Sequence, residues 1–182
     1  MSTGFLNGTL GNQQADDKPW KGLSIMTESP VPLDTIQGYC PPTAVQYSVF
    51  LSNKVGKMLD LTEIFDEAPV SMCAISVHEA SDHAVVRLIT NNALEARKTL
   101  KENHFPFSEH EVLVVELSDG HSLSKLCLYL LGAEINIAFA YPLMHSSSDS
   151  PAIAIAVDDP TLAGQILRRK GFKMLGECDL PY

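Results

Sequence analysis

The same order of secondary-structure elements is predicted twice along this chain of 182 residues. The spacing of apolar residues predicts strand, helix, strand, strand, helix and strand over residues 45–111, and the same series over residues 112–182. The end of the second helix aligns between the halves, because KENHF at residues 101–105 corresponds to RRKGF at residues 168–172. The chain is therefore predicted to contain two α+β modules of the ferredoxin-like type, each with two helices on one face of an antiparallel sheet.

The junction between the two modules leaves no room for a linker. Residues 105–117 have to supply both the last strand of the first module and the first strand of the second. We therefore expect the modules to lie side by side, with their sheets joined into one continuous antiparallel sheet and all helices on the same face. Residues 1–44 are rich in glycine and proline and only weakly periodic, and they are expected to form an extended N-terminal arm.

The segment between the first strand and the first helix is a candidate binding site. Apolar and polar residues alternate up to Ser52, and helical spacing begins after Gly56. A glycine here lets a ligand approach the backbone, and the start of a helix presents unpaired N–H groups and the positive end of the helix dipole. The segment can therefore hold a carboxylate. The plainer interpretation, also open, is that Gly56 only makes the turn.

Charge and composition narrow the function classes. The net charge of −9 argues against a nucleic-acid partner, because an acidic surface repels phosphate backbones. No apolar run is long enough to span a bilayer and the N-terminal residues do not read as a secretory signal, so we expect a cytoplasmic protein without a membrane partner. The four cysteines form no CxxC pair, so we expect no metal site, and nothing points to another cofactor. Cys73 and Cys127 fall in apolar periodic runs and are interpreted as small core residues.

No catalytic arrangement is recognisable in the sequence. A Ser/His/Asp elbow, an HExxH pair and a P-loop are all missing. The run EHE at residues 109–111 is interpreted as a solvated strand entry, because no further residue has the spacing of a metal ligand. Other users of the same fold are excluded as well. RNA-recognition modules need aromatic residues on the central strands and a basic face, and this sequence has neither. Metal chaperones need a paired-cysteine loop, which is also missing.

Short motifs in both halves resemble ACT domains. The segment NKVGKML at residues 53–59 follows an apolar strand and is similar to the N-x-P-G-x-L turn of that family. The segment EINI at residues 134–137 is similar to its G-[IV]-N-I segment, and KGFKML at residues 170–175 is also typical. The resemblance covers residues 45–180 and extends to small tandem-ACT proteins, some of which carry names linked to the regulatory subunit of acetolactate synthase.

The resemblance implies a small effector, usually an amino acid, bound where the strand–helix loop of one domain meets the second strand of another. The first site would consist of Asn53, Val55, Gly56, Lys57, Met58, Ile135 and Asn136. A second, weaker site would consist of Ser118, Asp119, Gly120, His121, Ser122, Ser71 and Met72. Both loops depart from the family pattern, because Val55 stands where the family has proline and His121 falls where a glycine is expected. We therefore expect one ligand per chain, at the first site.

Two functions of different classes follow from these observations. The leading hypothesis is a non-catalytic regulatory protein that binds an amino acid, with a branched-chain ligand favoured by Val55, Met58 and Ile135. The resemblance links the protein to acetolactate synthase and branched-chain amino-acid metabolism. An amino-acid biosynthetic enzyme and a second copy of the chain are its possible partners under this hypothesis. The alternative is a structural protein-interaction module with a degenerate ligand pocket, which the departures at Val55 and His121 favour. Catalysis of the synthase reaction is not expected, because the thiamine-diphosphate machinery is missing.

Overall fold

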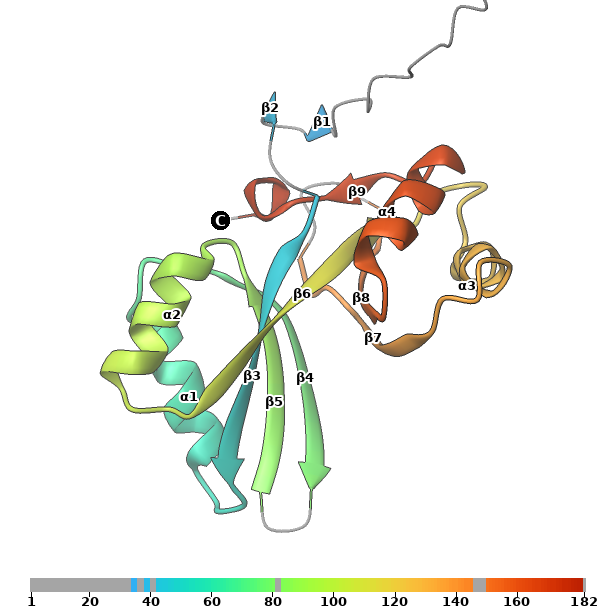
Figure 1. Ribbon diagram of the computed structural model, residues 1–182. Helices are drawn as coiled ribbons and strands as arrows, with labels where there is room; N and C mark the ends of the chain where they lie inside the picture. Colours follow the sequence, from blue (N-terminus) through green and yellow to red (C-terminus); the bar gives the residue numbers. More distant parts are fainter. Residues whose placement is uncertain (1–33, 36–37, 40–41, 81–82, 146–149, 182) are drawn as a thin grey trace, which may run out of the picture. The chain divides into compact units, whose positions relative to one another are not determined.

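The computed structural model describes residues 34–35, 38–39, 42–80, 83–145 and 150–181. Most of the expected N-terminal arm, residues 1–33, lies outside these described residues. Two short strands, β1 (Asp34–Thr35) and β2 (Gly38–Tyr39), pair antiparallel before the first module begins. The two predicted modules follow and share one sheet (Figure 1).

Each module has the predicted order of elements. The first consists of β3 (Ala44–Ser52), α1 (Lys57–Asp66), β4 (Met72–Ala80), β5 (His83–Thr90), α2 (Ala93–Glu102) and β6 (Phe107–Glu116). The second consists of β6 again, α3 (Leu123–Leu131), β7 (Ile137–Pro142), β8 (Ala152–Val157), α4 (Pro160–Arg169) and β9 (Met174–Leu175), and a short 3-10 helix, η1 (Glu177–Asp179), follows. The strands form a seven-stranded sheet in the order β4-β5-β3-β6-β8-β7, with β9 beside β6, and every pairing is antiparallel. The prediction of a continuous antiparallel sheet made of two ferredoxin-like modules is confirmed.

Local sequence explains where two of the helices begin. The side chain of Asn92 accepts a hydrogen bond from the backbone N–H of Glu95 at 3.1 Å and caps α2. The side chain of Asp159 accepts from the N–H of Leu162 at 2.8 Å and caps α4, and Pro160 takes the first helical position, where no N–H is needed.

The strand β6 belongs to both modules. Its residues 107–112 pair with β3, and its residues 113–116 pair with β8. The expected boundary after residue 111 therefore falls inside a strand. Side chains on a strand alternate between the two faces, so Phe107, Leu113 and Val115 share one face of β6. Phe107 packs under the helices of the first module and the other two pack under those of the second, so all four helices belong to the same face of the continuous sheet.

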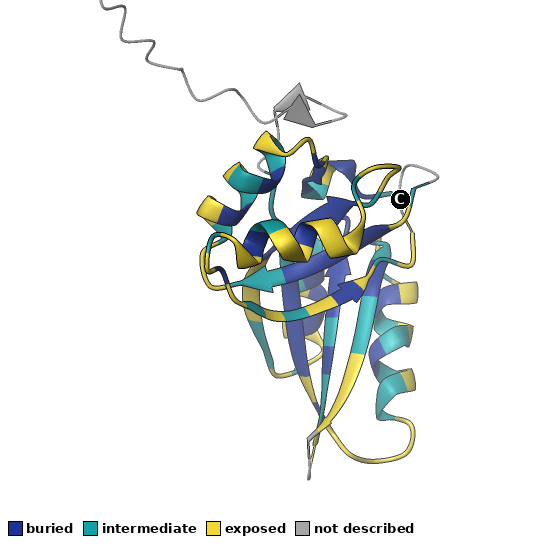
Figure 2. Cartoon of the chain, turned by 90° about the vertical axis from the view of Figure 1, so that its right-hand side faces the viewer, coloured by how far each residue is buried: buried dark blue, intermediate teal, exposed yellow. Residues whose placement is uncertain are grey.

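Each helix pair covers a core of its own. The inner sides of the helices are buried against the sheet, and their outer sides are exposed (Figure 2). Under α1 and α2 the largest fully buried side chains are Tyr47, Leu61, Leu88 and Leu100. Under α3 and α4 they are Leu113, Leu126, Leu130, Ile155 and Leu167.

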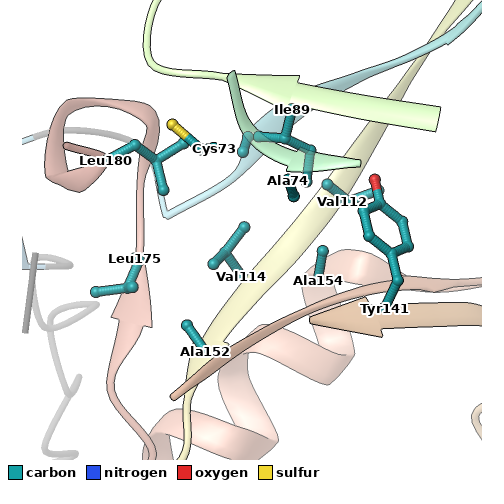
Figure 3. Close-up of a cluster of buried hydrophobic side chains, with 11 residues drawn as sticks. Cys73, Ala74, Ile89, Val112, Val114, Tyr141, Ala152, Ala154, Leu175 and Leu180 are labelled. Atoms are coloured by element: carbon teal, nitrogen blue, oxygen red, sulfur yellow. The ribbon is translucent and has the colours of Figure 1, made fainter. Parts of the chain in front are cut away.

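A third core fills the space on the other face of the sheet, because the sheet curls strongly at β6. Figure 1 accordingly shows α1 and α2 on the left and α3 and α4 on the right. Figure 3 shows the buried side chains that meet between the two halves of the curled sheet. They are Ala44, Cys73, Ala74, Ile89, Val112, Val114, Tyr141, Ala152, Ala154, Leu175 and Leu180. The four alanines among them allow the strands to approach closely.

Polar contacts also join the two halves of the curled sheet. The Tyr141 hydroxyl donates a hydrogen bond to Gln46 Oε1 at 2.9 Å, and Gln46 Nε2 donates to Ser48 Oγ at 3.0 Å. The Arg87 guanidinium lies 4.2 Å from the centre of the Phe139 ring, a cation–π contact from β5 to β7. At the outer strands, the N–H of Met144 donates to the carbonyl of Cys73 at 2.8 Å, so the ends of the sheet come close to each other.

The Tyr141–Gln46 hydrogen bond between the two modules is predicted to stabilise the folded chain. Replacing Tyr141→Phe leaves the fully buried Gln46 amide oxygen without this donor, and we expect a loss of about 1–3 kcal/mol in the free energy of unfolding. Denaturant titration measures this loss. Tyr129→Phe is the matched control, because Tyr129 is half-buried on α3 and its ring packs on Phe172 within the second module. Equal effects of the two substitutions would contradict the prediction.

The buried tyrosines predict a loss of stability in alkali. Burial raises the pKa of Tyr47 to about 12, and burial also raises the pKa of Tyr141. An unfolded tyrosine ionises near pH 10. The folded state holds the neutral form, so this stabilisation is complete below about pH 10 and is lost as the pH rises towards about 12. Denaturation midpoints measured across this window should fall, and they should fall less steeply for Tyr47→Phe. Parallel curves for the two proteins would refute the assignment.

Candidate functional site

The candidate site begins at the turn between β3 and α1. The N–H of Lys54 donates to Ser52 O at 2.7 Å, and the N–H of Lys57 donates to Lys54 O at 3.3 Å. Gly56 has a φ of 93°, in the left-handed region that favours glycine. Apart from its chain neighbours, no heavy atom lies within 4 Å of the point where a Cβ would stand on Gly56. The backbone beside the first turn of α1 is therefore open to a ligand.

The N-terminus of α1 differs from those of α2, α3 and α4. Each of the other three helices is capped by a side-chain oxygen, which comes from Asn92 for α2, from Ser122 for α3 and from Asp159 for α4. Gly56 has no side chain, and the first turn of α1 carries no side-chain cap. Apart from the N–H of Lys57, which bonds to Lys54 O, the N–H groups of its first turn and the positive end of its dipole are consequently available to an anion.

The chain already holds one carboxylate at the start of a helix. Glu177 Oε1 accepts a hydrogen bond of 2.6 Å from the backbone N–H of Ala93, at the start of α2. The two residues lie 84 positions apart in the sequence, so no local pattern could have predicted the contact. An uncapped helix start offers backbone N–H groups to a free carboxylate in the same way.

The remaining first-loop residues surround this open turn. Asn53 and Val55 are exposed, and the Val55 side chain projects fully into solvent. Met58 is half-buried and packs against the core of the first module. Lys57 Nζ forms an ion pair with the Asp60 carboxylate at 2.5 Å, so the acidic residue nearest the helix start is paired with a cation.

Ile135 and Asn136, the expected second half of this site, lie on the other module. Ile135 is buried in the core under α3 and α4. Asn136 is exposed, and its backbone N–H donates to Asp158 Oδ1 at 3.1 Å. Figure 1 places the connection between α3 and β7 beside the second module, away from the lower end of β3 where the first loop lies. Because the sheet curls, one chain does not bring these two groups of residues together.

The residues of the second loop, from Ser118 to Ser122, make their polar and ring contacts within the same chain. His121 Nε2 lies 3.2 Å from Lys170 O, and the His121 ring packs edge-on against Phe172 with centroids 5.0 Å apart. Gly171 makes room for this histidine, because a Cβ there would lie 2.9 Å from His121 Nε2. Ser122 accepts from Lys125 N at 3.4 Å, and Lys125 Nζ donates to Gly120 O at 2.7 Å. Judged by the helix start, the residue that matches Gly56 is Ser122, and His121 precedes it.

Ser71 and Met72 are not brought to the second loop. They line a hollow of about 680 Å³ between the end of α1 and the second module, which contributes His145 and Pro181. The backbone N–H of Ser71 donates to Asn91 Oδ1 at 2.9 Å. The role of Asn91 in holding Ser71 could not be seen in the sequence, because the two residues lie 20 positions apart.

The Cys73 thiol shows no sign of nucleophilic activation. Burial raises the pKa of the Cys73 thiol to about 11, so it is protonated at neutral pH. Cys127 is exposed on α3, and the expectation that it is a core residue is wrong. Only Leu126 and Leu130 of α3 are buried against the sheet, and Cys127 lies on the opposite side of the helix.

The described helices are all too short or too polar to cross a bilayer.

One solved structure and one family model agree with this architecture. No curated protein sequence matches the chain. Among solved structures, protein BT0572 from Bacteroides thetaiotaomicron has a TM-score of 0.67 and 24% identity, over 75% of this chain and 94% of that one. The regulatory subunit of aspartate kinase from Thermus thermophilus, in its ligand-free form, has a TM-score of 0.48 and 11% identity, over 69% of this chain and 88% of that one. A family model described as the ACT domain pair matches residues 42–180, which include both modules, and the chain therefore belongs to the ACT domain pair family.

Proposed function

We propose that this chain is a regulatory protein that binds a small effector, an amino acid, at the start of α1. Proteins of the ACT type are generally regulatory and non-catalytic, and their ACT domains bind small molecules. The observation that carries the proposal is the uncapped N-terminus of α1 behind an open glycine turn. The binding residues of the proposal are those of the first loop: Asn53, Val55, Gly56, Lys57 and Met58.

The carboxylate of the ligand is the group that this turn recognises. Backbone N–H groups in the first turn of α1 donate to it, and the dipole of the ten-residue helix adds a favourable field. Lys57 supplies a positive charge at the same end of the helix and is held there by Asp60. A side chain at position 56 would project into the space that the carboxylate needs.

The side chain of the ligand is proposed to be aliphatic. Val55 is fully exposed beside the turn, and Met58 is half-buried behind it. An apolar ligand side chain would cover part of Val55 and remove it from water. This favours leucine, isoleucine or valine over charged amino acids, and it supports the link to branched-chain amino-acid metabolism and to acetolactate synthase as a regulated enzyme. A cytoplasmic location is part of the same proposal.

Ile135 and Asn136 enter the proposal only as a contribution from another chain. The second loop is the weaker site, because Ser122 and Lys125 already occupy the groups that a ligand would need there. We therefore propose one ligand per chain.

Calorimetry with a branched-chain amino acid tests the first loop. Gly56→Val should abolish binding, because the new side chain blocks the approach to the helix N-terminus. Gly120→Val is the matched control. Gly120 also has a positive φ, 84°, and open space around it, so the two variants carry the same backbone strain in different loops.

The proposal makes three further demands on the same titrations. The methyl ester of the ligand should not bind, since it lacks the carboxylate, and His121→Ala should leave the affinity unchanged. Asn136→Ala should weaken binding by about 1–3 kcal/mol if another chain supplies this amide to the site. Equal loss of binding in the Gly56 and Gly120 variants, or two equal sites per chain, would contradict the proposal of one ligand per chain at the first loop.

A structural interaction module is the second candidate function. The exposed Val55 side chain and the exposed leucines of α3 favour it, because apolar surface outside a pocket marks contacts with other proteins. Failure of all twenty amino acids to raise the melting temperature of the folded chain would support this candidate over the first.

A further inference from the structure

Three cations beside the second loop are exposed and not neutralised. Lys125 Nζ donates to the backbone carbonyl of Gly120 at 2.7 Å. Lys170 Nζ lies 5.1 Å from the centre of the Tyr129 ring, a cation–π contact. Lys125, Arg169 and Lys170 are exposed, and within the described part of the chain none of them forms an ion pair. We call these three residues the basic patch.

The fold of the second module brings the basic patch together. His121 Nε2 lies 3.2 Å from the carbonyl oxygen of Lys170, which holds the second loop against the end of α4. Figure 1 shows this end of α4 beside the connection from β6 to α3. Tyr129 follows Lys125 by one turn on α3, so the Lys170 ammonium lies beside the helix face that carries Lys125. These two cations are therefore neighbours in space, and Arg169 precedes Lys170 at the end of the same helix.

The acidic residues nearby do not neutralise the basic patch. Asp119 is the acidic residue of the second loop, and among the described residues it forms no ion pair with any of the three cations. Glu116 on β6 forms its ion pair with Lys173, at 2.9 Å. On a chain with a net charge of −9, three exposed cations against one carboxylate reverse the sign of the charge locally.

The first module shows that the fold does not require these cations. Glu102 and Asn103 at the end of α2 stand where Arg169 and Lys170 stand at the end of α4. One cation in the last turn, Lys101, interacts with the dipole of α2. Three other helix cations of the first module are paired with carboxylates: Lys57 with Asp60, Lys98 with Glu95 and Arg97 with Glu109. The second module thus carries positive charge that its fold does not need.

We propose that the basic patch is a docking surface for an acidic segment of a partner protein. Carboxylates of such a segment accept hydrogen bonds from the Arg169 guanidinium and from the two ammonium groups. Because the Gly120 carbonyl and the Tyr129 ring already hold Lys125 and Lys170, these side chains lose little freedom when the partner binds. The contact does not depend on the binding of an effector at α1.

The charge of the rest of the chain favours a short acidic segment over a nucleic acid. A DNA duplex carries one negative charge per about 1.7 Å of its axis. It would bring these phosphates against the acidic remainder of a chain whose net charge is −9. A short run of aspartate or glutamate residues can contact the basic patch alone, and it is therefore the partner chemistry that fits.

Fluorescence anisotropy of a labelled oligo-glutamate peptide tests the proposal on the full chain. The peptide should bind at low ionic strength and should dissociate as salt is added, because salt screens exposed charges. The double variant Arg169→Glu, Lys170→Glu should weaken binding by about tenfold, as for the loss and reversal of several exposed ion pairs. The matched control Lys98→Glu, Lys101→Glu makes the same change of charge on exposed residues of α2, and it should bind the peptide like the unmodified chain.

A milder variant and a second polyanion complete the test. The double variant Arg169→Gln, Lys170→Gln removes the charges without reversing them and should show a smaller loss, and circular dichroism confirms that each variant is folded. Absence of peptide binding by the folded, unmodified chain would overturn the proposal, and so would equal losses in the two charge-reversal variants. Tighter binding of a DNA duplex than of the peptide, lost in the same variants, would overturn it too, because the basic patch would then be a nucleic-acid site.

Discussion

The shared strand β6 is the constraint on which the rest of the structure depends. Its hydrogen bonds go to β3 over the first half of its length and to β8 over the second half, so the modules cannot move as independent bodies. Alternation along the strand places Phe107, Leu113 and Val115 under helices and leaves Val112 and Val114 for the other face. The curl at β6 then closes that other face on itself and creates the third core.

The two modules share a fold and differ at corresponding positions. The start of α1 is uncapped and open, whereas the start of α3 is capped by Ser122 and held by Lys125. The outer side of α1 is polar and that of α3 is apolar. Duplication thus supplies two scaffolds from one topology, and a few side chains distinguish the open start of α1 from the closed start of α3.

Part of the candidate site was visible in the sequence. The open turn at Gly56 was predictable, because the change from a period of two to helical spacing marks the end of a strand and the start of a helix. The separation of Gly56 from Asn136 could not be predicted, since it depends on how far the sheet curls. The inequality of the two loops was predicted through His121, but the cap from Ser122 and the bond from Lys125 Nζ to Gly120 O close the second loop.

The sequence by itself determined the order of elements, the start of the last helix at Asp159, and the antiparallel joining of the modules through one strand. Each of these follows from local spacing or from a residue that acts on its own neighbours. Only the tertiary structure decided that Gln46 and Ser48 are buried and that Cys127 is exposed. The alternation in β3 shows that one face of the strand is apolar, but the curl of the sheet lays the second module over the other face. Gln46 then finds its partner in Tyr141, 95 residues away, which no local pattern encodes.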